Sequence, residues 1–445
     1  MSVPLHVLVI GGGIGGLCLA QGLRQAGVSV AVYERDRTPT DWLEGYRIHI
    51  NPTGSRALNE CLPPALWRAF LDAAGEPSAG LGFLTEQMQV LLFVELQTPD
   101  GSDDPARGHH PIGRLALRQL LLRGLDDVVH FAKQLVHYER LPDGKVRAFF
   151  ADGTTADGDV LVGADGVGSK VRRQYLPHAQ VVNTGVVGLG GQLPLTEGTR
   201  ARLPRPLTRW MNVILPPKGS GMFVAQLVHQ PGRACGGNGE LAAPRSGPLD
   251  AGESTVPCSE PFGDDGHDYA FWAFGAQRDR YGSNGDLRHL DGAELQRLAL
   301  RLIEGWHRDL RWMVAESDPR TVTAVPIQTS LPIQPWETSS VTLLGDAIHT
   351  MTPLQGLGGN TALRDASLLC RKLVAVDRGQ SELLPALREY ETAMLDYGAA
   401  AVRASLRAAR MSASDNGLGR AAFKTLLRVS NVVPPLKQRL FGTNG

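Results

Sequence analysis

The fold of this chain is decided near its beginning, by the stretch VLVIGGGIGG at residues 7–16. Residues Val3–Ile10 become continuously apolar and β-branched, which predicts a strand buried on both faces. A glycine-rich turn follows, and then apolar residues at helical spacing over Leu17–Gln25, ending at Gly27. A further apolar run, Val28–Tyr33, predicts a second buried strand. A strand, turn, helix and strand in this order predict the parallel sheet of an α/β protein.

The turn has the spacing GxGxxG, formed by Gly11, Gly13 and Gly16, with Ile14 and Gly15 between the last two. In such a turn the first glycine permits a tight bend and the second lets the backbone approach a pyrophosphate. The third glycine lets the helix pack closely on the strand, and the helix N-terminus then faces the phosphates. The spacing alone is weak evidence, but its place between a strand and a helix favours a dinucleotide site.

An acidic residue at the end of the second strand supports this interpretation. Glu34 follows the glycines at about the 20-residue distance at which a carboxylate accepts hydrogen bonds from ribose hydroxyls. Arg35 comes next and is either a contact to adenine or phosphate or an ordinary surface arginine. The glycine-rich turn and Glu34 together therefore predict a dinucleotide site.

Composition excludes several classes of protein. Among the 445 residues, Lys+Arg and Asp+Glu both number 45, so no net charge attracts nucleic acid. The five cysteines are scattered without a CxxC pair, which predicts neither a metal site nor a disulfide framework. The sequence has no basic leader before an apolar run and no apolar run of about 18 residues, so we expect a cytoplasmic protein without a membrane span.

The middle of the chain changes character. Alternating apolar segments from Val181 to Tyr281 predict an antiparallel sheet, which residues 82–97 are expected to join. Residues 231–268 are rich in Gly, Pro, Ser and acids and predict a long surface excursion. Helical spacing returns at 292–315 and from Thr361 onward. We predict a Rossmann-like dinucleotide-binding domain of residues 1–80, 111–178 and 286–375, interleaved with a smaller antiparallel-sheet domain of residues 81–110 and 179–285, and a C-terminal helical region of residues 376–445.

Two further segments share the pattern of the first turn, in which a buried strand leads directly into glycines. DVLVGADGVGS at 159–169 is a buried strand that leads into Gly163, Asp165 and Gly166. VTLLGDAIH at 341–349 is another, ending in Gly345 and Asp346. The glycine-rich stretch PLQGLGGN at 353–360 then precedes a helix, whose N-terminus carries positive potential.

With these motifs the sequence resembles the single-component FAD-dependent aromatic hydroxylases, which share the fold of para-hydroxybenzoate hydroxylase. The family's three fingerprints occur in order: GxGxxG with Glu34-Arg35, GADG at 163–166, and GDAIHTMTPLQGLGGN at 345–360. A weaker fourth match is RLAL at 114–117, similar to the family's RxxL helix start. The departures are Ile348 where the family usually has Ala, and Thr352 before Pro353 where it has Pro-Pro.

The resemblance implies a role for each matching position. Gly11, Gly13 and Gly16 would hold the FAD pyrophosphate, Glu34 the adenosine ribose, and Asp346 the ribityl chain. Arg114 would reach FAD or be a surface cation, and Asp165 and Gly166 would support the flavin and the passing nicotinamide. The implied cofactor-binding set is Gly11, Gly13, Ile14, Gly15, Gly16, Glu34, Arg35, Arg114, Asp165, Gly166, Gly345, Asp346, Pro353, Gly356, Gly358, Gly359 and Asn360, with the amides of 356–360 facing the flavin N1 and O2 edge.

The substrate site is less well defined by sequence. In the family, the loop matching residues 45–51 passes the isoalloxazine, which makes Arg47 and His49 candidate lining residues or simply solvated loop residues. A pocket between the two sheets would be lined by aromatic residues on alternating strand positions. Each candidate has an alternative place in the core. The candidates are Trp210, Phe223, Phe271 and Trp272.

The implied activity is that of an NAD(P)H- and FAD-dependent monooxygenase. Such an enzyme passes a hydride to flavin, captures O2 as a C4a-hydroperoxide, and hydroxylates an aromatic or polycyclic small molecule. The protein would supply a dry pocket, orientation and a base for a phenol. Only one GxGxxG is evident, so NAD(P)H would dock transiently at the flavin face. The alternatives are epoxidation or Baeyer-Villiger oxidation, an FAD-binding reductase, or a non-catalytic flavoprotein that shields an intermediate.

Overall fold

A five-stranded parallel sheet forms one half of the molecule. The computed structural model describes residues 4–39, 46–96, 103–229, 267–282 and 287–441. The sheet has the order β17-β11-β1-β2-β7, and every neighbouring pair is parallel. Its strands are β1 (His6–Ile10), β2 (Ser29–Tyr33), β7 (Val129–His130), β11 (Val160–Gly163) and β17 (Val341–Leu343). The α/β class and the Rossmann-like parallel sheet predicted from the first 33 residues are thereby confirmed.

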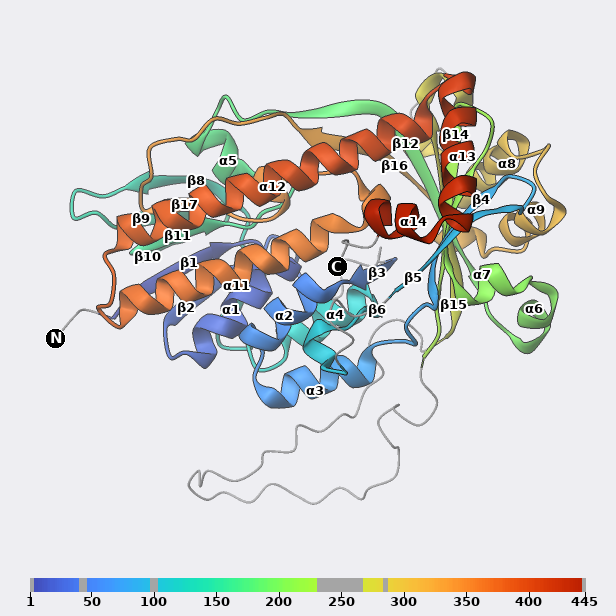
Figure 1. The fold of residues 1–445 in the computed structure, drawn as a ribbon. Coiled ribbons are helices and arrows are strands. Elements are labelled where there is room, and N and C mark those ends of the chain that lie inside the picture. The colour runs from blue at the N-terminus through green and yellow to red at the C-terminus, as the bar shows by residue number, and fades with distance from the viewer. Residues whose placement is uncertain (1–3, 40–45, 97–102, 230–266, 283–286, 442–445) are drawn as a thin grey trace.

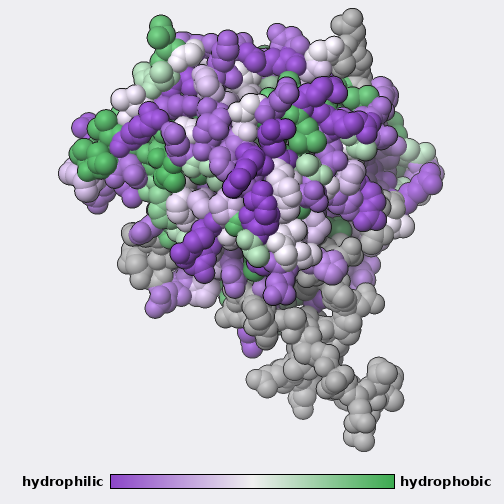
Figure 2. Space-filling view, turned by 90° about the vertical axis from the view of Figure 1, so that its right-hand side faces the viewer, coloured by the Kyte–Doolittle hydropathy of each residue, from purple (hydrophilic) through white to green (hydrophobic). Residues whose placement is uncertain are grey.

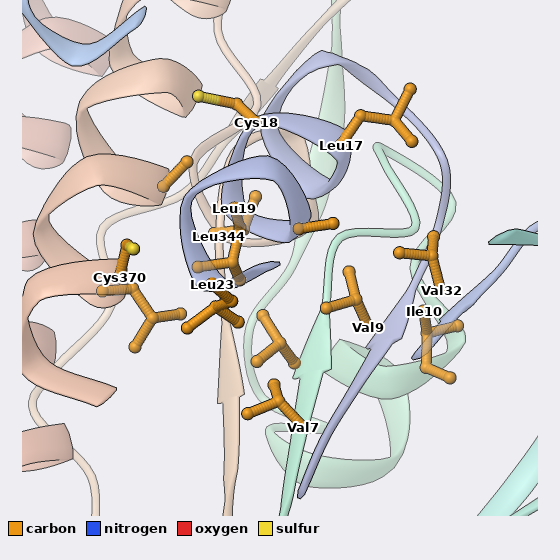
Figure 3. Close-up of a cluster of buried hydrophobic side chains, with 14 of the residues drawn as sticks. Val7, Val9, Ile10, Leu17, Cys18, Leu19, Leu23, Val32, Leu344 and Cys370 are labelled. Atoms are coloured by element: carbon orange, nitrogen blue, oxygen red, sulfur yellow. The ribbon is translucent and has the colours of Figure 1, made fainter. Parts of the chain in front are cut away.

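Helices cover this sheet and bury its apolar faces. Figure 3 shows Val7 and Val9 of β1 in one cluster with Leu23 of α1 and with Leu344 and Cys370. Val7, Val9 and Leu23 are fully buried, and each such side chain contributes about 1.5–3 kcal/mol of transfer free energy. The helices of this half are α1 (Ile14–Gln25), α2 (Pro52–Cys61), α3 (Pro64–Ala73), α4 (Arg114–Leu122), α5 (Lys170–Tyr175), α10 (Asp346–His349) and α11 (Leu357–Asp377).

Two small antiparallel sheets accompany the parallel one. The ribbon of β3 (Arg47–Ile50) and β6 (His110–Gly113) pairs Arg47 with Gly113 and Ile50 with His110. It lies between the parallel sheet and the other half of the molecule (Figure 1). The second small sheet is a meander of β8 (Leu135–Arg140), β9 (Val146–Phe150) and β10 (Thr155–Gly158).

A seven-stranded sheet forms the second half, in the order β16-β12-β15-β14-β13-β4-β5. Its pairs are antiparallel except β13 with β4. The expected strand segment 82–97 contributes β4 and β5, so chain segments of the two halves alternate in sequence. The strands are β4 (Gly80–Thr85), β5 (Val90–Glu95), β12 (Val181–Pro194), β13 (Met211–Leu215), β14 (Ser220–Leu227), β15 (Tyr269–Gln277) and β16 (Thr323–Ser330).

One face of this sheet is covered by short helices and the other is turned toward the parallel-sheet half (Figure 1). Leu189, Val224 and Phe274 point into a core with the helices, whereas the alternate residues form the face that we call the inner face. Figure 2 shows that the outer side is mostly hydrophilic, with apolar residues in separate patches. The covering helices are α6 (Glu197–Arg202), α7 (Arg205–Arg209), α8 (Gly292–Leu302) and α9 (Arg308–Ala315).

The C-terminal helices join the two halves. The 31-residue α12 (Leu383–Ala413) runs the length of the molecule, from beside α11 to the seven-stranded sheet (Figure 1). Helix α13 (Gly417–Val432) packs on β5, and α14 (Pro434–Phe441) follows it. Helix α13 begins directly after Asn416 and α14 begins at Pro434, where a turn residue and a proline interrupt the helical spacing. Among the described residues, no helix is long and apolar enough to cross a membrane.

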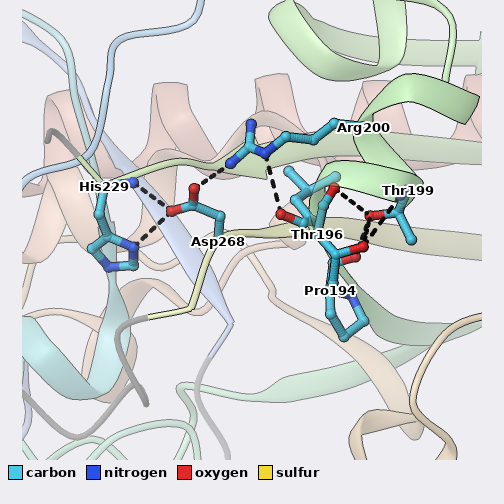
Figure 4. Close-up of polar contacts among 7 residues, drawn as sticks. Pro194, Thr196, Thr199, Arg200, His229 and Asp268 are labelled. Carbon is cyan, nitrogen blue, oxygen red and sulfur yellow. Dashed lines mark hydrogen bonds and ion pairs between the residues drawn. The ribbon is translucent and has the colours of Figure 1, made fainter.

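Polar contacts hold together the two strand ends on either side of residues 230–266. Those residues lie outside the described part of the chain, and they include most of the surface excursion predicted for residues 231–268. Asp268 accepts hydrogen bonds from the backbone N–H of His229 at 2.8 Å and, on the other oxygen, pairs with Arg200 (Figure 4). Arg200 also donates to the Leu195 carbonyl at 3.1 Å. The end of β14 and the start of β15 are therefore fixed to each other and to α6.

Candidate functional site

Three glycine-bearing segments leave the same edge of the parallel sheet. Ile10 of β1 is aligned with Gly163 of β11, and Gly163 with Leu343 of β17. Because parallel strands end at a common edge, the segments 11–16, 164–169 and 344–349 begin side by side. This edge is where open α/β sheets bind ligands. The structure thus brings together the three motifs that the sequence analysis combined.

Contacts that only glycine permits hold the three segments together. Gly11 has φ of +112°, and a Cβ there would lie 2.4 Å from the carbonyl oxygen of Ala164. A Cβ on Gly16 would lie 2.2 Å from the Gly11 carbonyl oxygen. A Cβ on Gly15 would lie 2.8 Å from Leu344 Cδ1, which connects the first segment to the third. Gly11 and Gly16 are glycine because the backbones touch there, and Gly15 is glycine because the Leu344 side chain packs directly on the helix.

Other glycines of the same segments border open space. Their surroundings show whether the residues present fit a cofactor. A Cβ added to Gly13, Gly166, Gly356 or Gly359 would meet no heavy atom within 4 Å. At Gly358 the nearest atoms to such a Cβ would be 3.7 Å and 3.9 Å away. Glycine beside open space lets a ligand approach the backbone closely. Each of the three segments thus has backbone beside open space, so the residues present fit an elongated dinucleotide such as FAD.

Glu34 and Arg118 fix the shape of the first turn. Glu34 is 7% exposed, and its carboxylate accepts a hydrogen bond from Gly12 N–H at 2.6 Å. Arg118 of α4 is 1% exposed and donates to the Gly12 carbonyl at 3.0 Å and to the Pro39 carbonyl at 2.8 Å. Its other nitrogen lies 3.4 Å from an Asp36 carboxylate oxygen. Both backbone groups of Gly12 are therefore held by charged side chains.

Asp346 and Arg114 lie close enough to interact electrostatically at this edge of the sheet. Gly345, with φ of +61°, turns the chain so that Asp346 begins α10. Asp346 is exposed to solvent in the cofactor-free protein, but partial desolvation by the protein around it raises the pKa of its carboxyl, although nearby His349 and Arg114 oppose the rise. Burial lowers the pKa of Arg114, and Asp346 counteracts that change. The predicted RxxL and GDAIH segments therefore place a guanidinium and a carboxylate within electrostatic range of each other.

A buried network supports the Gly345–Asp346 turn from behind. Asp365 of α11 is fully buried, and one of its oxygens accepts hydrogen bonds from Gly345 N–H at 2.8 Å and His349 Nε2 at 2.6 Å. The other oxygen accepts from the Tyr397 hydroxyl at 2.6 Å. Despite burial, the nearby Asp365 carboxylate raises the pKa of His349. His349 therefore has a structural role behind the turn.

Asn360 connects the start of α11 with the β3–α2 junction. Its amide oxygen accepts from Asn51 N–H at 2.9 Å, and its amide nitrogen donates to the carbonyls of His49 at 2.8 Å and Gly356 at 2.9 Å. The Asn360 side chain thus orders the loop, and the open backbone at 356–359 is left for a ligand. Pro353, at the start of the short helix η5 (Pro353–Gln355), is exposed nearby.

Arg47 and His49 lie on one face of the β3–β6 ribbon, which we call the β3 face, because strand residues two apart point the same way. Arg47 reaches the seven-stranded sheet, where its Nη1 lies 3.7 Å from Met211 Sδ. His49 Nε2 shares a hydrogen bond of 2.8 Å with His109 Nδ1. Burial lowers the pKa of His49 well below its usual value and that of His109 to about 4, so both rings are neutral at pH 7.

The four aromatic candidates for a substrate pocket occupy different surroundings. Phe271 lies on the inner face, with its ring 4.5 Å from that of Tyr46, and Phe223 is half-buried on the same face. Trp210 lies 4.4 Å from the Phe93 ring at the β4–β5 edge. Trp272 is fully buried in the outer core and donates from Nε1 to Ser317 Oγ at 2.8 Å. The alternation along β15 therefore favours Phe271 and gives Trp272 a packing role.

Two predicted cofactor residues direct their side chains elsewhere. The Asp165 carboxylate accepts from Ser169 Oγ at 2.5 Å and from Lys170 N–H at 2.7 Å, so it caps the start of α5. Its effect on the cleft is to order the turn that carries Gly166. Arg35 is exposed on the surface. This exposure favours the interpretation of Arg35 as an ordinary surface arginine.

Sequence reasoning missed Arg118 and Asp365. Arg118 is four residues after Arg114 on α4, so the two arginines share a helix face, and that spacing could have indicated it. Asp365 had no comparable signal, because its partners are distant in sequence and its role appears only when α10 and α11 pack together.

Comparison with known proteins agrees with this geometry. The model of the FAD binding domain family matches residues 276–405, and that of the NAD(P)-binding Rossmann-like domain family matches residues 9–70. A dual O-methyltransferase/FAD-dependent monooxygenase of Cercospora beticola is 30% identical over 404 residues, covering 87% of this chain and 44% of that protein. This chain thus spans less than half of the length of that relative.

Two solved structures are similar over nearly the whole chain. A protein of Photorhabdus luminescens classed as an FAD-containing monooxygenase is 34% identical, with a TM-score of 0.77, and the match covers 92% of this chain and 98% of that one. HpxO of Klebsiella pneumoniae, complexed with FAD and uric acid, is 23% identical, with a TM-score of 0.72 and coverage of 97% and 95%. At that identity the second likeness shows the fold alone.

The chain belongs to the family of FAD-dependent monooxygenases that includes the single-component aromatic hydroxylases. The family predicted from the glycine-bearing motifs is confirmed.

Proposed function

We propose that this chain is a monooxygenase that uses bound FAD, NAD(P)H and dioxygen to hydroxylate an aromatic or polycyclic small molecule. The observation that carries the proposal is the meeting of three glycine-bearing segments at one sheet edge, with open space beside their backbones. Family membership supports it. The same geometry suits epoxidation or Baeyer-Villiger oxidation, which differ in substrate.

The residues that would hold FAD follow the cleft. The turn at Gly11–Gly16 would hold the pyrophosphate at the N-terminus of α1, and Glu34 the adenosine ribose. Asp346 and Arg114 would hold the ribityl region. The open amides before and within the first turn of α11 would offer positive potential to the electron-rich edge of the flavin ring. Bound FAD supplies the redox chemistry, accepting a hydride from NAD(P)H and passing one atom of dioxygen to the substrate.

The remaining chemistry belongs to the protein. The substrate would lie between the β3 face and the inner face, where Phe271 and Tyr46 supply aromatic surface that excludes water. His49 Nδ1 is buried and has no hydrogen-bond partner among the described residues. As a neutral imidazole it can accept a hydrogen bond from a substrate hydroxyl at that atom. NAD(P)H would dock transiently, because the sequence carries a single GxGxxG.

The cell compartment and the domain limits are part of the same proposal. Cys18, Cys61 and Cys370 are free and buried, which fits a reducing cytoplasm. The alternation of the two halves along the chain supports the limits 1–80, 81–110, 111–178, 179–285, 286–375 and 376–445.

Purified protein provides the test. Bound FAD would give a yellow protein, which NADH or NADPH should reduce and which should consume oxygen faster in the presence of a substrate. Incorporation of one oxygen-18 atom from dioxygen into an aromatic product would establish the monooxygenase. Reduction without an oxygenated product would favour the reductase, and the absence of reduction would favour the non-catalytic flavoprotein. A protein that binds no FAD would overturn all three.

A further inference from the structure

Arg47 is a buried cation without an anionic partner. Its residue is 8% exposed, and its Nε and Nη2 have neither solvent contact nor a hydrogen-bond acceptor among the described residues. Its Nη1 approaches only the thioether sulfur of Met211, at 3.7 Å. A thioether is a weak acceptor on a flexible side chain. Two guanidinium nitrogens of Arg47 therefore lack an acceptor among the described residues, at the place where the β3 face meets the seven-stranded sheet.

The charge on Arg47 persists in this setting. Burial lowers its pKa to about 10, and the nearby Tyr269 phenol opposes the change, so the guanidinium is protonated at neutral pH. Removing such a charge from water without a compensating partner is costly. A compensating negative charge must come from outside the described residues, and a bound ligand can provide it.

The other buried arginines show what a structural arginine looks like in this protein. Arg118 has two carbonyl acceptors and a nearby carboxylate. Arg420, which is 6% exposed, donates to the carbonyls of Met411 at 2.7 Å and Ser412 at 2.8 Å and approaches others. Arg172 donates to two carbonyls. Arg47 is equally enclosed but lacks any oxygen acceptor within the described residues.

The neighbours of Arg47 indicate what kind of ligand would meet it. His49 shares its face and is neutral at pH 7, so it does not add a second cation. Met211 and Tyr269 belong to β13 and β15, which places Arg47 against the second sheet. Phe271, two residues after Tyr269, points to the same side of β15 and contacts Tyr46. The surroundings combine one cation with aromatic surface.

We propose that Arg47 determines substrate specificity by binding a negatively charged oxygen, so that the substrate is an aromatic acid. This inference rests on the proposed function and names the substrate class of that site. The oxygen belongs either to a carboxylate or to an ionised hydroxyl, both of which match a guanidinium fork. The ligand oxygen would take the place of the Met211 sulfur, because a charge-assisted hydrogen bond is far stronger than a contact to a thioether.

Binding of probes to the FAD-loaded protein tests the proposal. Salicylate is compared with salicylamide for the carboxylate, and pentafluorophenolate with pentafluoroanisole for the ionised hydroxyl. Perturbation of the flavin spectrum gives each Kd. In the wild type, the anion of at least one pair should bind at least about 10-fold more tightly than its neutral counterpart. The pair that shows the preference identifies the source of the charge. In Arg47→Gln that preference should fall to within about 3-fold, and Arg47→Lys should restore part of it.

A second measurement needs no substrate or probe molecule. Arg47→Met replaces an enclosed, unpaired charge by an apolar side chain of similar length and should raise the Tm of the FAD-loaded protein by a few degrees. A structural arginine would give a lower Tm on the same change. Arg308→Gln is the control, because that arginine is 84% exposed on α9 and remote from the β3 face.

The outcomes separate the two proposals. Protein that binds FAD and oxidises NAD(P)H, but prefers the anion in neither probe pair, would overturn the role of Arg47 while leaving the monooxygenase intact. Loss of FAD affinity or a changed flavin potential in Arg47→Gln, with the anion preference retained, would assign Arg47 to the cofactor and overturn the inference. Failure to bind FAD in the wild type would instead overturn the proposed function.

Discussion

Asp365 and His349 form a buried pair, with the carboxylate oxygen 2.6 Å from Nε2 of the ring, although they lie on different helices. The same oxygen accepts the amide of Gly345. The pair therefore holds the turn that presents Asp346 to the cleft. It connects the packing of α10 and α11 to the geometry of the proposed cofactor site.

Asp365→Asn should destabilise the protein and weaken FAD binding. The amide oxygen can keep one hydrogen bond, but the ionic partner of His349 is lost in a buried site, which costs about 2–4 kcal/mol of unfolding free energy. Denaturant unfolding and FAD titration measure the two effects. The exposed Asp396→Asn on α12 serves as the matched control. An Asp365 variant as stable as this control would contradict the role given to the pair.

A pair of glycine variants should separate folding from cofactor binding. Gly11→Ala places a Cβ 2.4 Å from a backbone oxygen at φ of +112°, so it should cost more than about 3 kcal/mol of stability. Gly13→Ala meets open space and should fold with a loss near 1 kcal/mol, but its methyl group would occupy the space proposed for the pyrophosphate.

We expect Gly13→Ala to bind FAD at least about 10-fold more weakly, as measured by titration of the cofactor-free protein. Gly305→Ala, which also borders open space away from the cleft, should behave like the wild type. Normal FAD affinity in Gly13→Ala would show that the pyrophosphate lies elsewhere.

Arg118→Met should loosen the first turn. The change leaves the carbonyls of Gly12 and Pro39 without their charged donor, which costs about 2–4 kcal/mol of unfolding free energy. FAD affinity should fall as well, because Gly12 lies between the glycines of the motif. Thermal unfolding with and without added FAD distinguishes the two losses. The exposed Arg428→Gln provides the reference, and equal behaviour of the two variants would refute the assignment.

Sequence could predict the parts of this site that are made by backbone. A buried strand that ends in glycines predicts both a parallel sheet and the edge of that sheet where a ligand binds. The sequence therefore predicts that residues 11–16, 163–166 and 345–346 belong to one site. Side-chain roles were harder, because they depend on which way a residue points. Trp272 and Phe271 are neighbours with opposite surroundings, and Asp165 uses its carboxylate to cap a helix. Arg118 and Asp365 act across the packing of distant segments, which local spacing does not encode.

Acid should destabilise the protein through His109. Its pKa is about 4 in the folded chain, mainly because of burial, and about 6.5 when unfolded. Between these values the unfolded chain binds a proton that the folded chain does not. The free energy of unfolding should therefore be nearly unaffected above about pH 6.5 and fall by about 3 kcal/mol as the pH drops toward 4. His109→Asn should flatten this part of the pH profile, whereas the exposed His178→Asn should leave it unchanged.

Asp346→Ala should abolish FAD binding without lowering the stability of the cofactor-free protein. Desolvation raises the pKa of this carboxyl, so its charge is less favourable in the folded, cofactor-free protein than in the unfolded chain. Removing it should leave the cofactor-free protein as stable as the wild type or more stable, while the yellow colour is lost on purification. Differential scanning calorimetry of the cofactor-free protein and the absorbance spectrum measure the two effects. The exposed Asp72→Ala on α3 should change neither. Full retention of FAD by Asp346→Ala would show that the ribityl region does not lie beside α10, and the alignment of the three segments along one cofactor would then have to be abandoned.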